Sequence, residues 1–195
     1  MDNSDLIPVH VGLMGHIDAG KTSVARCLSE IVSTAGLDKH SQAQKRGITI
    51  DLGFTFFRLE NFIITLVDAP GHADLIKSVF SAANIIDTAI VVVDAAEGPQ
   101  VQTGEHLVIL DLIGIPFLFV VINKIDIANQ EQLKNTENKI QSILNKTRFK
   151  DYYTISRVSS KNNVGFDTLK EKLVNFFDQK NIIRQIQNPL IYLID

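Results

Sequence analysis

The stretch Gly15-His16-Ile17-Asp18-Ala19-Gly20-Lys21-Thr22 decides the fold of this 195-residue chain. It follows an apolar run over 9–14, which predicts a β-strand, and it opens an amphipathic segment over 22–33, which predicts a helix. Glycines at both ends of the loop leave room for backbone N–H groups to surround a phosphate, and the helix dipole points at the same place. The order strand, glycine loop, helix therefore predicts a phosphate site at the carboxyl end of the first strand.

Apolar runs alternate with longer amphipathic segments along the rest of the chain. Further strands are expected over 52–59, 62–67, 88–93, 117–122 and 153–158, and further helices over 73–83, 101–112, 130–145 and 166–177. The first two of these strands form a hairpin with a turn at Glu60-Asn61, and helices separate the others. This alternation predicts an α/β fold with a doubly wound, mostly parallel six-stranded sheet, helices on both faces, and ligands at the carboxyl ends of the strands.

Composition narrows the class of protein. A net charge of −3 gives no global basic field for nucleic acid, and the hydrophobic fraction of 45% is that of an ordinary core. One cysteine, Cys27, excludes a disulfide framework and is expected to pack on the first helix. His106 is expected to cap or pack rather than to catalyse, and no zinc site is assigned. No segment is apolar enough to be a signal peptide or to span a bilayer, so we expect a cytoplasmic protein with no membrane partner.

The phosphate loop assigns roles to consecutive residues. Those expected to contact the phosphates are Asp18, Ala19, Gly20, Lys21, Thr22 and Ser23. Lys21 supplies positive charge to the β- and γ-phosphates, and the Thr22 hydroxyl suits Mg²⁺, which prefers oxygen ligands. Asp68 is expected to reach Mg²⁺ through water, and Gly71 to donate its backbone N–H to the γ-phosphate. The phosphate loop alone does not choose between ATP and GTP.

A second group of polar residues follows the last two predicted strands. Asp126 can accept two hydrogen bonds from N1–H and N2–H₂ of guanine, donors that adenine lacks, so a mismatched base leaves a carboxylate unpaired. Lys124 is expected to lay its methylene stem over the base, and Asn123 to tie loops together more than to touch GTP. The stretch Ser159-Ser160-Lys161 can give a backbone N–H to guanine O6. These residues, spaced as they are after the phosphate loop, predict a site for GTP and GDP.

Four motifs resemble the P-loop GTPase fold shared by Ras-like and translational GTPases. They are the phosphate loop over 15–22, the stretch Asp68-Ala69-Pro70-Gly71-His72, and two base loops, Asn123-Lys124-Ile125-Asp126 and Ser159-Ser160-Lys161. Two features are similar to the translational branch: the stretch Lys45-Arg46-Gly47-Ile48-Thr49-Ile50, and His72, where Ras-like proteins carry glutamine. The resemblance implies that Thr49 gives Mg²⁺ a second hydroxyl and that Ile17 and Ile48 form an apolar gate to the γ-phosphate. It also implies that His72 orients the attacking water once the large-subunit RNA of the ribosome draws it inward.

Further stretches are similar to the selenocysteine-specific elongation factors of archaea and eukaryotes. They are Ser33-Thr34-Ala35-Gly36-Leu37-Asp38-Lys39, Ile48-Thr49-Ile50-Asp51-Leu52-Gly53-Phe54, Thr65-Leu66-Val67-Asp68-Ala69-Pro70-Gly71-His72-Ala73-Asp74-Leu75-Ile76 and Gln102-Thr103-Gly104-Glu105-His106. The resemblance implies a GTP-binding domain over 1–180, and a linker with the start of a truncated β-barrel domain over 181–195. In that family, domains beyond this chain hold selenocysteyl-tRNA.

Two alternatives stay open at this point. One is the GTPase domain of another tRNA-carrying factor, either the general elongation factor or the gamma subunit of the initiation factor. A longer first switch, the region of 45–50, with a cysteine-bearing insert would favour the initiation factor. Cys27 is the one cysteine of this chain, which argues against that alternative. The other alternative is a nucleotide-dependent switch module without efficient catalysis.

Overall fold

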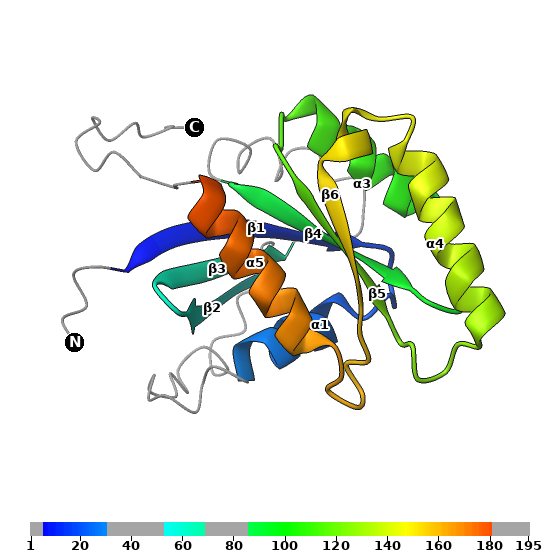
Figure 1. Ribbon diagram of the computed structural model, residues 1–195, viewed down its shortest axis with the longest axis horizontal. Coiled ribbons are helices and arrows are strands. Elements are labelled where there is room, and N and C mark those ends of the chain that lie inside the picture. The colour runs from blue at the N-terminus through cyan, green and yellow to red at the C-terminus, as the bar shows by residue number, and fades with distance from the viewer. Residues whose placement is uncertain (1–5, 31–52, 69–85, 181–195) are drawn as a thin grey trace.

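The structure is a computed structural model, and it describes residues 6–30, 53–68 and 86–180 (Figure 1). Its strands are β1 (Ile7–Gly15), β2 (Gly53–Leu59), β3 (Phe62–Asp68), β4 (Thr88–Asp94), β5 (Leu118–Asn123) and β6 (Tyr153–Arg157). Its helices are α1 (Lys21–Glu30), α3 (Val101–Leu112), α4 (Gln130–Leu144) and α5 (Phe166–Lys180), with the short 3-10 helix η4 (Arg148–Asp151) before β6.

The strands form one six-stranded sheet in the order β2-β3-β1-β4-β5-β6. β2 runs antiparallel to β3, and every other neighbouring pair is parallel. The predicted doubly wound, mostly parallel sheet is therefore confirmed. Because β1, β3, β4, β5 and β6 point the same way, the segments that follow them leave from one edge of the sheet, where ligands bind in this architecture.

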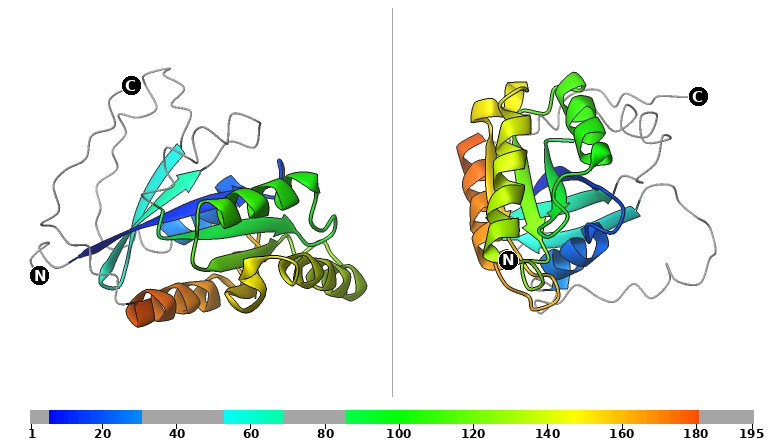
Figure 2. Two further views of the ribbon diagram at one scale, coloured as in Figure 1. Left: turned by 90° about the horizontal axis from the view of Figure 1, so that it is seen from above. Right: turned by 90° about the vertical axis from the view of Figure 1, so that its right-hand side faces the viewer.

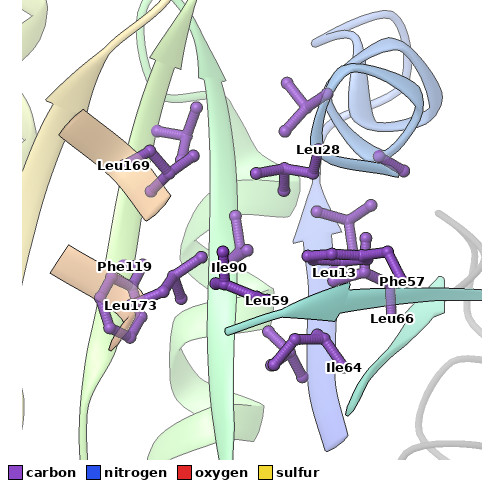
Figure 3. Close-up of a cluster of buried hydrophobic side chains, with 14 of the residues drawn as sticks. Leu13, Leu28, Phe57, Leu59, Ile64, Leu66, Ile90, Phe119, Leu169 and Leu173 are labelled. Atoms are coloured by element: carbon purple, nitrogen blue, oxygen red, sulfur yellow. The ribbon is translucent and has the colours of Figure 1, made fainter. Parts of the chain in front are cut away.

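Helices cover both faces of the sheet, each over its own hydrophobic cluster. On one face, Leu28 of α1 and Leu169 and Leu173 of α5 pack with strand residues such as Leu13 and Phe119 (Figure 3). On the other face, residues of α3 and α4 pack against alternate residues of β4 and β5. α3 and α5 accordingly lie on opposite sides of the sheet (Figure 2). β4 and β5 are buried along their whole length, as expected for central parallel strands.

The boundaries of several elements differ from the predicted ones by a few residues. β1, β3, β4 and β5 each end one residue after the predicted apolar run, because ladder pairing includes a glycine or a polar residue at the strand end. β1 also begins two residues before its predicted start, and β5 begins one residue after its own. α5 continues to Lys180, three residues past the predicted end. α4 begins where predicted, because Asn129 and Gln132 exchange backbone–side-chain hydrogen bonds as a capping box.

Two predicted segments lie wholly outside the described residues, the helix over 73–83 and the second-domain segment over 181–195, and the last three residues of the helix predicted over 22–33 lie outside them as well. Among the helices that the structure describes, none is both long and apolar enough to cross a membrane.

Candidate functional site

The glycine loop leaves β1 at the carboxyl edge of the sheet and leads directly into α1. Its backbone has positive φ at Gly15 (144°), Asp18 (63°) and Gly20 (91°). A Cβ atom on Gly15 would lie 2.3 Å from the Val92 carbonyl oxygen, and one on Gly20 would lie 2.3 Å from Nδ2 of Asn123. Glycine is required at both ends because neighbouring protein groups, not only a bound phosphate, occupy the space of a side chain.

The first turn of α1 presents a cation and two hydroxyls beside this loop. The Lys21 ammonium donates to the carbonyl oxygens of Gly15 (3.0 Å) and His16 (3.1 Å), so its charge is held against the loop. Thr22 and Ser23 follow it with exposed side chains, whereas Ala19, within the loop, is buried. The helix N-terminus, the lysine and the exposed hydroxyls together suit an anion with an associated cation.

The N-terminal half of α3 holds the first peptides of the loop. The buried imidazole of His106 accepts a hydrogen bond at Nδ1 from the Gly15 backbone N–H (3.1 Å). Burial, helped by the positive charge of Lys21, lowers the pKa of His106 to about 4, so the ring is neutral at neutral pH and can accept. Oε1 of Gln102 contacts Nδ1 of His16 (2.8 Å) and accepts from the Ile17 backbone N–H (3.3 Å). His106 packs as expected, and it also fixes the phosphate loop.

Asn123 joins the phosphate loop to the segment that follows β6. Its buried Nδ2 donates to the Ala19 carbonyl oxygen (3.1 Å), and its Oδ1 accepts from the Ser160 backbone N–H (3.1 Å). The two hydrogen bonds span 104 and 37 residues of sequence. The expected role of Asn123, to tie the loops together, is confirmed by these contacts.

Asp126 lies exposed on the loop after β5, and one neighbour orients its carboxylate. The hydroxyl of buried Ser159 donates to Oδ1 of Asp126 and also accepts from the Asn162 backbone N–H (3.1 Å). The Ser159 hydroxyl is the main cause of a lowered pKa at Asp126, with further help from the charges of Lys161 and Lys124. Asp126 is therefore ionised at neutral pH, with its second oxygen free of any hydrogen bond from Ser159.

Cys27 lies beside the same loop. Its half-buried thiol on α1 donates to the Ser160 carbonyl oxygen (3.4 Å), which adds a contact between the first helix and the segment after β6. The expectation that Cys27 packs on the first helix agrees with this position.

Asp94 is the residue of this region that sequence reasoning missed. It ends β4 beside Asn123 in the register of β4 and β5, and its carboxylate pairs with the Lys124 ammonium at 2.8 Å. The signal that could have found it is the one that selected Asp68, a carboxylate at the end of an apolar strand. Gln102 was likewise given no role of its own, because a glutamine near the start of a helix carries no such signal.

The remaining predicted residues are only partly placed. Asp68 is the last residue of β3, in register with Leu13 of β1, and Ile17 is 38% exposed on the loop. Lys161 is exposed after Ser160. Ile48, Thr49, Gly71 and His72 lie outside the described residues. Within residues 6–30, 53–68 and 86–180, no three His, Cys, Asp or Glu side chains gather as a metal-binding group.

The sequence is similar to those of translation factors. The selenocysteine-specific elongation factor of Methanocaldococcus jannaschii is 54% identical over 187 residues, which cover 96% of this chain and 40% of that protein. The translation initiation factor 2 subunit gamma of Haloquadratum walsbyi is 37% identical over 187 residues, which cover 83% of this chain and 44% of that protein. The chain thus spans less than half the length of these relatives.

A solved structure shares the fold. The crystal structure of translation elongation factor SelB from Methanococcus maripaludis, in complex with the GTP analogue GppNHp, aligns with a TM-score of 0.78 and 45% identity. The alignment covers 94% of this chain and 37% of that one. Residues 8–179 match the sequence model described as the elongation factor Tu GTP binding domain. Because this match spans most of the chain, the chain belongs to the family of elongation factor Tu GTP-binding domains.

Proposed function

We propose that this chain binds GTP and hydrolyses it to GDP and phosphate, as the GTPase domain of a translation factor that delivers selenocysteyl-tRNA to the ribosome. The observation that carries the proposal is the pair of hydrogen bonds in which Asn123 donates to the Ala19 carbonyl oxygen and accepts from the Ser160 backbone N–H. These bonds hold the phosphate loop and both base loops as one unit, so a nucleotide that engages one end finds the other end in place.

Selection of guanine falls to Asp126 and Ser160 in this proposal. Ser159 orients the ionised Asp126 carboxylate toward the donors N1–H and N2–H₂ of guanine. Ser160 contributes through its backbone, whose own N–H donates to Oδ1 of Asn123 and fixes the segment Ser159-Ser160-Lys161, so a serine is as suitable there as a smaller residue. Adenine would leave the carboxylate without a partner, which is the strongest form of discrimination that a polar pocket offers.

Hydrolysis rests on positioning and charge. The Lys21 ammonium, now held by carbonyl oxygens of Gly15 and His16, is placed to meet the β- and γ-phosphates. The exposed Thr22 hydroxyl in the first turn of α1 fits Mg²⁺, with Thr49 and Asp68 as its proposed companions, and the ion supplies positive charge to the phosphate oxygens. Gly71 would sense the γ-phosphate, His72 would orient the attacking water, and Ile17 and Ile48 would gate its approach.

The relatives support the wider role. Identity is higher with the archaeal selenocysteine-specific factor (54%) than with the initiation factor subunit (37%), although the chain covers less than half of either. We therefore assign selenocysteyl-tRNA binding to parts of the whole protein beyond residues 1–180, and activation to the large-subunit RNA of the ribosome. The cytoplasm, where ribosomes work, is the proposed location.

The test of this proposal is GTP hydrolysis by the chain with and without ribosomes. We expect slow release of phosphate from GTP alone and an increase of at least about 10²-fold on addition of ribosomes, because the element that positions His72 comes from outside the chain. The same reaction with GDP in place of GTP serves as the blank. A rate that ribosomes never raise would instead support the alternative of a switch module without efficient catalysis.

A further inference from the structure

Lys124 is anchored at its charged end by a buried carboxylate that the proposed function does not use. Oδ2 of Asp94 lies 2.8 Å from the Lys124 ammonium, and the Asp94 side chain is only 7% exposed. Its other oxygen, Oδ1, accepts the backbone N–H groups of Ala96 (2.7 Å) and Glu97 (3.2 Å). Both oxygens of this carboxylate are thus occupied, and one of them is committed to Lys124.

The segment that carries Asp94 is fixed from three sides. The Ala95 backbone N–H donates to the Asn123 carbonyl oxygen (2.8 Å), and the Gly98 N–H donates to the Asp94 carbonyl oxygen (2.9 Å). On α4, the buried Thr136 hydroxyl donates to the Ala95 carbonyl oxygen (3.0 Å). The carboxylate therefore belongs to a turn that hydrogen bonds join to β5 and α4, and this turn sets the place at which Lys124 is anchored.

Lys124 itself leaves β5 in a conformation that needs support. Its φ is 64°, in the left-handed region that lysine rarely adopts, and the Ile127 backbone N–H closes a turn onto its carbonyl oxygen (3.2 Å). Its Cε lies 4.0 Å from the position that a Cβ atom on Gly20 would occupy. The methylene stem thus passes beside the phosphate loop before its ammonium reaches Asp94.

The charges agree with this arrangement. Burial alone would raise the pKa of Asp94, but the hydrogen bonds from Lys124, Ala96 and Glu97 outweigh it and lower the pKa. The carboxylate is ionised and offsets the charge of Lys124, which leaves Lys21 as the cation placed for the phosphates. A lysine side chain without such an anchor keeps its rotamer freedom, which nucleotide binding would then have to restrict.

We infer that Asp94 is a positioning residue of the guanine site, which holds Lys124 so that its methylene stem forms a fixed wall for the bound nucleoside between the base loop and the phosphate loop. Asp94 touches no nucleotide in this arrangement and acts through Lys124 alone. The inference rests on the proposed function, because the stem needs a base to cover, and it adds a determinant of affinity outside the four motifs.

A double-mutant cycle on the 195-residue chain tests the inference. Asp94→Asn keeps the side-chain shape and an oxygen for Ala96 and Glu97, but it removes the charge. Lys124→Met keeps an unbranched stem and removes the ammonium. We expect Asp94→Asn to raise the dissociation constants of GDP and GTP about tenfold in the original chain, and less than about twofold in the Lys124→Met background.

The matched control is Glu97→Gln, which removes an exposed carboxylate from the same turn and leaves both dissociation constants unchanged within about twofold. Should Asp94→Asn fail to fold, Asp94→Ser keeps a hydroxyl for the Ala96 N–H and replaces it in the cycle. Equal losses from Asp94→Asn with and without Lys124 would overturn the inference, because Asp94 would then act through its turn.

A nucleotide-free readout separates this inference from the proposed function. The original chain, Asp94→Asn, Lys124→Met and the double variant are unfolded by denaturant without nucleotide, where non-additive effects on the free energy of unfolding report the ion pair itself. If the unfolding free energies show coupling between Asp94 and Lys124, but Asp94→Asn leaves the dissociation constants of GDP and GTP unchanged, the positioning role is overturned and GTP binding stands. If the unfolding free energies show this coupling but the original chain binds no guanine nucleotide, both the positioning role and the proposed function are overturned.

Discussion

The Asp126→Asn variant is expected to bind GTP about 10²–10³-fold more weakly than the original chain and to prefer xanthosine triphosphate. In the proposed site the carboxylate accepts two hydrogen bonds from guanine, and an amide would set its own N–H₂ against one of those donors. Xanthine carries an oxygen at position 2, which accepts from that amide. Competition of both triphosphates against a fluorescent guanine nucleotide measures the change.

The contacts of Asp126 favour a single orientation of an asparagine at this position. Ser159 is buried and donates to Oδ1, so it can hold an asparagine oxygen in the same place and direct the amide nitrogen at the base. Asp167→Asn is the control, because it removes the same charge from an exposed position in the first turn of α5. If base preference stays with guanine in Asp126→Asn, the assignment of the base site is wrong.

Replacing His72 by alanine is expected to abolish the stimulation of hydrolysis by ribosomes, a loss of about 10²–10⁴-fold in the stimulated rate. An imidazole that orients water acts only in the transition state, so the variant should bind GTP within a few-fold of the original chain. Phosphate release in single turnovers, with ribosomes in excess, separates the chemical step from product release.

The same preparation supplies its own control. Dissociation constants of GTP and GDP for His72→Ala show whether the site remains intact, and basal hydrolysis without ribosomes shows whether slow chemistry persists. Stimulation retained at the level of the original chain would remove His72 from the mechanism.

Most of the sheet could be predicted from sequence because the signals were local. The run before Gly15 and the buried strand at 88–93 are apolar and bounded by turns, which fixes strands to within a residue or two. The strand ends are less predictable. Asp94 and Asn123 pair in register at the ends of β4 and β5, and nothing in either segment alone shows that the partner strand extends equally far.

Residues of the candidate site that are expected to contact the nucleotide were mostly predictable from the sequence. Residues that act by contacting another residue were mostly not. Gly20, Lys21 and Asp126 were predicted from the needs of phosphate and guanine, and Asn123, which joins two loops, was predicted because it stands three residues before Asp126. Contacts such as Gly15 with His106, or Lys124 with Asp94, join residues that lie far apart in the chain and are brought together only by the fold. Their side chains look like those of ordinary packed or capping residues until the sheet order is known.

The central claim, one site that holds phosphates and reads guanine, is tested most directly by dissociation constants of the chain for GTP, GDP and ATP in the presence of Mg²⁺. We expect micromolar or tighter binding of GTP and GDP and no measurable binding of ATP at the same concentrations. Equal affinity for ATP and GTP, or no binding of either guanine nucleotide, would contradict it.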